Sequence, residues 1–175
     1  MKKSDINPLP QYWDGYINLV PDVELSQAFD DSIRQLNDVD RNMLTRIGDK
    51  TYAPGKWTVK DIIQHLTDGE RVMAYRGVLF ARQNGATAQG FEQDEFVANA
   101  NANGRTIEDL LDELLIVRRA TKALFDSFND DMLRAKGVSW VHETSVLHLG
   151  FMIIGHQVHH FNVIADRYSA LDLAN

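Results

Sequence analysis

Apolar residues recur every three or four positions through four long segments of this chain, and this spacing is what most constrains its fold. Two of the segments follow Thr58 and Thr106, each with an aspartate three positions later, as in a helix-capping box. No segment of useful length alternates apolar and polar residues with the period of a strand. The pattern predicts an all-α protein with helices over about 22–48, 58–82, 106–128 and 144–168.

Four helices of this length make a four-helix bundle the simplest architecture, as a single domain over residues 1–175. The first 21 residues differ from the rest, because they contain Pro8, Pro10 and Pro21. We expect an irregular arm over 1–21, with Tyr12, Trp13 and Tyr16 packed on the bundle. A second irregular stretch is expected over 129–143.

The connection over residues 84–104 is long for a compact domain. Fully extended it could reach roughly 60 Å, which exceeds the roughly 36 Å length of the helix before it. The connection could therefore cross the bundle from end to end and make the helices on either side of it parallel. A short helix is expected within it, over 93–100.

Charge and composition narrow the function. The net charge of −7 and the absence of a run of Lys and Arg disfavour a nucleic-acid partner. No stretch approaches the roughly 20 apolar residues that span a bilayer, and no apolar run follows the N-terminal lysines as in a secretory signal. We expect a cytoplasmic protein without a membrane partner. The chain has no cysteine, so nitrogen and oxygen atoms would have to bind any metal.

His156 and His160 lie four residues apart in the last predicted helix, so both project from one face. That face is apolar, since it also carries Met152, Ile153 and Val163. Each neutral imidazole has a donor and an acceptor to satisfy, and one metal ion can bind two histidines at this spacing. A second interpretation stays open at this point: buried histidines are often hydrogen-bonded core residues without a ligand.

A third histidine, His65, lies at the edge of the apolar stripe of the second predicted helix, beside Ile62. Gly69 leaves space one turn further on. One ligand from one helix and a pair from another is a common arrangement of metal sites in bundles. Asp68 could accept a hydrogen bond from the His65 ring, although a solvated position is the simpler interpretation.

Other polar residues leave alternatives open. His159 or His148, on a flank of the last helix, could replace one of the pair, although partly exposed surface positions are the simpler interpretation. His142 carries no signal. Glu70 and Arg76 are interpreted either as members of interhelical ion pairs or as site residues.

Four stretches of the sequence together resemble the DinB-like superfamily, over nearly the whole chain after residue 24. The stretch APGKWTVKDIIQHLTDGERVMAYR (53–76) resembles the family's second helix, with its Trp, Ser or Thr, acidic residue and His. The final-helix motif resembles GHQVHHFNVI (155–164). A common pattern between the two motifs is similar to GFEQDEFVANAN (90–101) and VRRATKALFDSF (117–128). Thr58 stands where Ser is more usual and is an equivalent cap.

The resemblance implies a four-helix bundle of up-down-down-up connectivity. It also implies a divalent metal ion, nickel or zinc being frequent, bound by His65, His156 and His160. Three protein ligands leave positions open, as in catalytic sites. Some relatives are similar to thiol S-transferases, so a small-molecule substrate such as a low-molecular-weight thiol is the leading expectation, with hydrolysis next.

A different class of function stays open, because no residue stands out as a dedicated base or nucleophile. The chain could be a non-catalytic protein that binds a metal or a small ligand in a stress response. The resemblance also implies that the apolar faces could support a homodimer.

Overall fold

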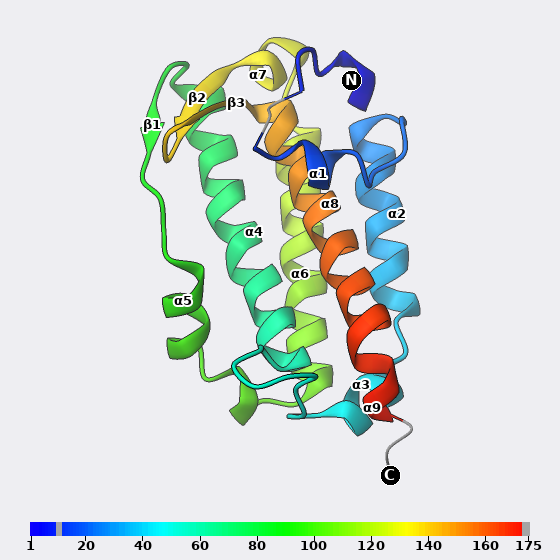
Figure 1. Cartoon of the computed structure of the whole chain (residues 1–175). Coiled ribbons are helices and arrows are strands. Elements are labelled where there is room, and N and C mark those ends of the chain that lie inside the picture. Colours follow the sequence, from blue (N-terminus) through cyan, green and yellow to red (C-terminus); the bar gives the residue numbers. More distant parts are fainter. Residues whose placement is uncertain (10–11, 173–175) are drawn as a thin grey trace.

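The computed structural model describes residues 1–9 and 12–172, and they are mostly helical. The four longest helices of these residues lie side by side as a bundle (Figure 1): α2 (Leu25–Asp38), α4 (Val59–Arg82), α6 (Ile107–Asp126) and α8 (Val146–Val163). Helix α4 packs against α6 and α8, and α2 packs against the same two helices. None of the helices in these ranges is long and apolar enough to cross a membrane.

The starts of α4 and α6 are as the sequence predicts. The Thr58 hydroxyl accepts a hydrogen bond from the Asp61 N–H at 3.1 Å, and the Asp61 carboxylate accepts one from the Thr58 N–H at 3.0 Å. The capping box is therefore present at α4. Thr106 caps α6 in the same way, accepting from the Asp109 N–H. These short-range bonds satisfy amide groups that have no partner within the helix.

The helix expected over 22–48 is two helices, and this prediction is corrected here. Helix α2 ends at Asp38, and α3 (Arg41–Ile47) begins after Asp40. The Asp40 carboxylate accepts a hydrogen bond from the Met43 N–H at 2.9 Å, so Asp40 is a helix cap. The helical spacing of apolar residues continues through the break, so the periodicity alone does not predict that the helix divides at Asp40.

The last predicted helix starts later than expected and changes character at its end. Thr144 belongs to a strand, and Ser145 caps α8. After Val163 the chain makes a π-helical turn, η3 (Ile164–Tyr168), and ends the described part in α9 (Ser169–Asp172). The backbone spirals on through Tyr168, but with the wider hydrogen-bonded turns of a π-helix.

A small sheet departs from the all-α prediction. It has the order β1-β2-β3, with β1 (Thr87–Ala88) parallel to β2 (Lys136–Ser139) and β2 antiparallel to β3 (His142–Ser145). Together with α7 (Asp130–Arg134), this hairpin replaces the irregular stretch expected over 129–143. Its turn, Trp140–Val141, lacks the Gly, Asn or Asp of common two-residue hairpins, so the sequence carries no hairpin signal.

The N-terminal arm contains two short helices, η1 (Lys3–Asp5) and α1 (Asp14–Ile17). Trp13 is buried, as expected, but Tyr12 is largely exposed. Pro10 lies outside the described residues. Helix α1 packs on α8 at Gly155, where a Cβ atom would come within 2.0 Å of the Tyr16 carbonyl oxygen. Only glycine permits this close approach, which brings α1 to the middle of the bundle.

The long connection runs back along α4. It leaves β1 near the end of α4, forms α5 (Gln93–Asn99) and reaches η2 (Ala102–Gly104) at the start of α4 (Figure 1). There the Asn103 amide donates a hydrogen bond to Asp61 at 3.0 Å. Because α6 begins beside the start of α4, these two helices run in the same direction. The short helix expected over 93–100 is confirmed as α5.

Two apolar clusters form the core, and a layer of polar side chains lies between them in sequence on all four long helices. One cluster includes Phe29, Phe80 and Phe125, and the other includes Leu36 and Leu114. The polar residues in or beside this layer include Ser32 on α2, His65 and Glu70 on α4, Arg118 on α6, and His156, Gln157 and His160 on α8. Polar groups at this depth need partners, and they divide into two groups, described next.

Candidate metal centre

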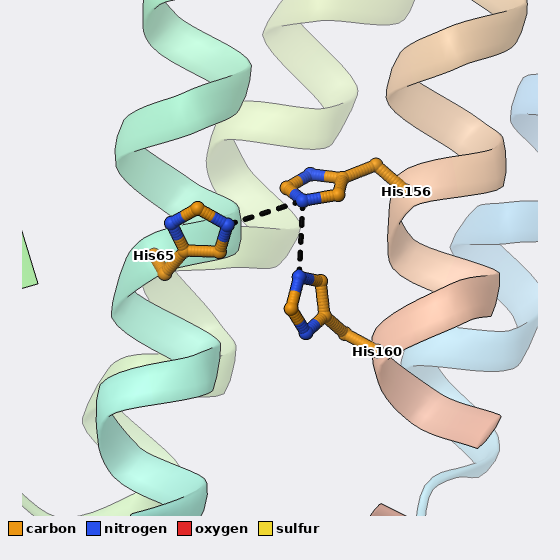
Figure 2. A group of neighbouring side chains, drawn as sticks. All are labelled: His65, His156 and His160. Atoms are coloured by element: carbon orange, nitrogen blue, oxygen red, sulfur yellow. Dashed lines mark hydrogen bonds between the residues drawn. The ribbon is translucent and has the colours of Figure 1, made fainter. Parts of the chain in front are cut away.

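Three imidazole rings converge between α4 and α8. The Nε2 atom of His156 lies 3.1 Å from that of His65 and 3.0 Å from that of His160 (Figure 2). His65 comes from the second turn of α4, and the other two come from successive turns of α8. The structure thus brings together the three histidines singled out in the sequence. In the part of the chain that the structure describes, these three histidines form the one group of potential ligand side chains spaced closely enough to bind a single ion.

The spacing of these atoms fits a metal ion. Ligand nitrogens that each lie about 2.0–2.1 Å from one ion are separated from one another by roughly 2.9–3.3 Å. The two Nε2–Nε2 distances to His156, 3.1 and 3.0 Å, fall in that range. The Nδ1 atom of His160 is buried with no hydrogen-bond partner among the described residues. This atom is unsatisfied whether the cluster is only hydrogen-bonded or binds a metal, so it does not distinguish the two interpretations. The convergence of the Nε2 atoms is the observation that favours an ion.

The three rings are neutral at physiological pH. Withdrawal from water lowers the pKa of His65 to about 4, partly offset by the charge of Asp94, and lowers that of His160 to about 3. The pKa of His156 is held well below its usual value by the same cause and by the neighbouring rings. Neutral imidazole keeps a lone pair for a metal, which protonation would remove.

Aromatic side chains surround the three histidines. The Trp57 ring lies 4.7 Å from that of His65 and is roughly parallel to that of His160. On the other side, the Tyr16 ring meets that of His156 edge-on at 5.3 Å. These contacts restrict the rotation of the imidazoles, and a fixed donor set is what a metal site requires.

A cavity of about 290 Å³ adjoins the histidines. Its lining includes His65 and His156 and, three turns further along α4 than His65, Arg76. Ser139 also lines it, and lies on the Arg76 side because it pairs with Ala88, the neighbour of the Gln89 carbonyl that Arg76 contacts. Gly69 lies on its wall, where a Cβ atom would be 3.8 Å from the His156 ring, an ordinary contact. The space is near the lower end of the range for small-molecule pockets, and two of the three histidines, His65 and His156, line it.

The remaining histidines do not join the cluster. His148 lies at the start of α8, where its Nδ1 accepts a hydrogen bond from the Ser145 N–H at 3.2 Å. The His142 ring stacks on Tyr12. His159 points to the Tyr16 side of α8, its ring 5.0 Å from that of His160. Neither His148 nor His159 therefore replaces a member of the pair.

The two charged residues left open by the sequence have different surroundings. Glu70 forms a buried, bidentate ion pair with Arg118 of α6, with N–O distances of 2.9 to 3.0 Å. Arg76 pairs with no carboxylate among the described residues. Asp68 accepts hydrogen bonds from Gln64 and Arg71, and among the described residues no hydrogen bond joins it to His65, one of the two possibilities left open by the sequence.

Sequence reasoning missed Arg118, which lines the same cavity as His65 and His156. Its guanidinium also donates to the Ser32 hydroxyl at 2.7 Å and to the side-chain oxygen of Gln157, the neighbour of His156, at 2.6 Å. A charged residue at a core position of the 106–128 pattern was the available signal, because such a residue is almost never buried unless paired.

The fold and the site together define a helical bundle with an inward-facing three-histidine cluster. Residues 24–164 match the family model described as the DinB superfamily, and the chain belongs to that superfamily. The comparison with curated proteins returned no match.

A solved structure supports the same fold. YfiT from Bacillus subtilis is 14% identical to this chain, with a TM-score of 0.66, and the match covers 97% of this chain and 91% of YfiT. That protein is described as "a probable metal-dependent hydrolase with an unusual four-helix bundle topology". At this level of identity the likeness shows the fold alone.

Proposed function

We propose that His65, His156 and His160 bind a divalent metal ion, nickel or zinc, and that the chain is a metal-dependent enzyme acting on a small molecule. One observation carries the proposal: three neutral imidazoles present their Nε2 atoms to one point beside a cavity. The part of the chain that the structure describes offers no fourth His, Asp or Glu to this cluster. Catalytic metal sites keep such an open position, whereas structural zinc sites are closed by four ligands.

The ion would supply Lewis acidity, which lowers the pKa of a bound thiol or water toward neutrality. The side chains of this protein favour the thiol. Glu70 is engaged by Arg118, so it is not available as a base. A thiol has a far lower pKa than water, so it needs less help from a base to ionise. The reaction is then S-transfer: sulfur bonds to an electrophilic carbon, the bond from that carbon to a leaving group such as chloride breaks with its electron pair, and the thiol proton passes to solvent.

Hydrolysis is the second candidate, and one observation favours it. YfiT, a solved structure of similar fold, is described as a probable metal-dependent hydrolase. The same three histidines and the same cavity would serve a water nucleophile, with Asp94 as the carboxylate whose charge reaches His65.

Activity and metal content test the proposal together. Purified protein, loaded with nickel or zinc, is assayed with cysteine plus monochlorobimane and, separately, with p-nitrophenyl acetate. We expect turnover that a chelator removes and that His65→Ala abolishes without loss of the helical circular-dichroism spectrum. His159→Ala is the matched control, because it removes an imidazole from the next position of α8 and should retain turnover.

Full turnover in metal-free protein would show the enzyme proposal to be wrong. Stoichiometric metal without turnover of either substrate would instead favour the non-catalytic, metal-binding class of function.

We further infer an up-down-down-up connectivity for the four long helices. It is supported by the shared direction of α4 and α6: Arg105, just before α6, donates to Gln64 near the start of α4, and Arg118 of α6 pairs with Glu70, which lies further along α4. The course of the connection through α5 and η2 agrees with it (Figure 1).

A further inference from the structure

Arg76 is a buried cation without a carboxylate partner. Its side chain is on α4, three turns beyond His65, and the residue is only 3% exposed. The guanidinium donates to the Gln89 carbonyl oxygen at 2.7 Å and to the Met73 sulfur at 3.3 Å, and it lies 5.9 Å from the centre of the Phe91 ring. No Asp or Glu of residues 1–9 and 12–172 forms an ion pair with it.

This arrangement is unusual because a buried charge is costly unless it is paired. An arginine has five N–H donors, and the contacts to Gln89 and Met73 use two of them. Sulfur is a weak acceptor, so one of these two bonds compensates little. Arg118, at comparable depth, has acceptors for four of its five N–H groups, including the carboxylate of Glu70. The difference indicates that an acceptor for Arg76 comes from outside the chain.

Ser139 provides a second, independent sign at the same end of the cavity. It is 1% exposed, and its Oγ has no hydrogen-bond partner among the described residues. Ser139 comes from β2, far from Arg76 in sequence, yet both residues line the cavity that reaches His65 and His156. A buried hydroxyl without a partner calls for an explanation, such as a ligand atom that it binds.

The charges around the cavity leave one positive charge uncompensated. Glu70 and Arg118 neutralise each other. The only other carboxylate in the lining is that of Glu92, which is exposed, so water and salt screen it. Between His65 and Arg76 the wall includes the apolar side chains of Leu66, Met73, Met152 and Ile153, together with the mutually neutralised Glu70 and Arg118.

We propose that Arg76 and Ser139 bind a carboxylate group of the substrate, at the end of the cavity opposite the histidines. One uncompensated positive charge matches a monoanion, and the planar guanidinium can bind a carboxylate through two parallel hydrogen bonds. The substrate class is therefore a small carboxylic acid with an apolar middle. Its reacting group lies on the order of 15 Å from the carboxylate, the rise of three helical turns.

The inference rests on the proposed function in one respect: it assumes that the substrate reacts beside the three histidines. It is therefore tested on metal-free protein, kept so with a chelator, by isothermal titration with octanoate and with octan-1-ol. The two probes share an alkyl chain and differ in charge. We expect octanoate to bind at least about tenfold more tightly than octan-1-ol, since a hydrogen-bonded charge adds about that much.

Variants locate the binding. Arg76→Gln is expected to weaken octanoate about ten- to a hundredfold and to leave octan-1-ol unchanged. The matched control is Arg119→Gln, which removes the same charge from an exposed position of α6 and should change nothing. Ser139→Ala removes a hydroxyl without a partner, so it should fold normally and weaken octanoate about three- to tenfold.

Equal affinities for octanoate and octan-1-ol, or an Ser139→Ala variant with unchanged octanoate affinity, would overturn the assignment even if Arg76→Gln failed to fold. Because no metal is present, such a result would leave the three-histidine proposal standing. If the protein bound octanoate as expected but took up no nickel or zinc, the carboxylate site would stand and the three-histidine metal site would be wrong.

Discussion

Two neighbouring groups of polar side chains in the bundle differ in how completely they are hydrogen-bonded. The Arg118 guanidinium and the Glu70 carboxylate are almost fully buried, and their bonds to each other, Ser32 and Gln157 join all four long helices. The three histidines beside them meet only one another at Nε2, with the cavity at their side. Satisfied polar groups stabilise a core, whereas groups with lone pairs to spare are suited to bind a ligand.

The comparison teaches that burial alone does not identify a site. Arg118 is more buried than His156, yet its guanidinium is already bonded to Glu70, Ser32 and Gln157. We therefore assign Arg118 and Glu70 to the architecture of the bundle, and the histidines to its function. The following predictions separate the two roles, beginning with the largest effect.

Breaking the ion pair should have the largest effect on stability. Glu70→Ala leaves the Arg118 charge buried without its partner, which we expect to lower the free energy of unfolding by about 3–5 kcal/mol. Urea denaturation followed by circular dichroism measures it. The matched control is Glu113→Ala, which removes a carboxylate from a partly exposed network with Arg71 and Arg105 and should cost about 1 kcal/mol or less.

Similar losses in the two variants would contradict the structural role of the buried pair. A double variant, Glu70→Leu with Arg118→Met, removes both charges at once. We expect it to recover most of the lost stability, because no unpaired charge then remains in the core.

Metal binding should stabilise the protein through the histidines alone. At a free metal concentration about a hundred times the dissociation constant, nickel or zinc should raise the free energy of unfolding by about 2.7 kcal/mol. His156→Ala should remove this gain and His159→Ala should keep it, as measured by thermal or urea unfolding with and without a chelator. A gain that survives in His156→Ala would place the ion elsewhere.

The metal-free protein should lose stability as the pH is lowered below about 6.5. The unfolded chain takes up protons near pH 6.5, whereas the folded chain resists until the pKa of about 4 at His65 and about 3 at His160. Unfolding therefore becomes easier as pH falls from about 6.5 to about 4, by up to about 1.4 kcal/mol per pH unit for each such histidine.

The midpoints of urea denaturation at pH 7, 6 and 5 measure this dependence. Above pH 7 these histidines should add no pH dependence to the stability, because they are neutral in both the folded and the unfolded chain. His148 has its pKa lowered to about 4 as well, so part of the slope belongs to the start of α8. A variant with glutamine at positions 65, 156 and 160 should keep only that part. An unchanged slope in this variant would mean that the histidine cluster is not held neutral.

Much of the fold follows from local sequence. The spacing of apolar residues and the caps at Thr58 and Thr106 act within one or two turns, so they predict α4 and α6 closely. The same spacing failed at Asp40, where one cap divides a continuous apolar pattern into α2 and α3. It also failed for β2 and β3, whose pairing depends on a turn without the usual residues.

The candidate site divides in the same way. That His156 and His160 share a face is a property of one helix, and sequence alone determines it. Only the tertiary structure decided that His65 joins them, that Glu70 faces Arg118 rather than a ligand, and that Arg76 shares a cavity with Ser139. The physical reason is range: helix geometry relates residues a few positions apart, whereas the packing of whole helices and a distant strand relates the rest.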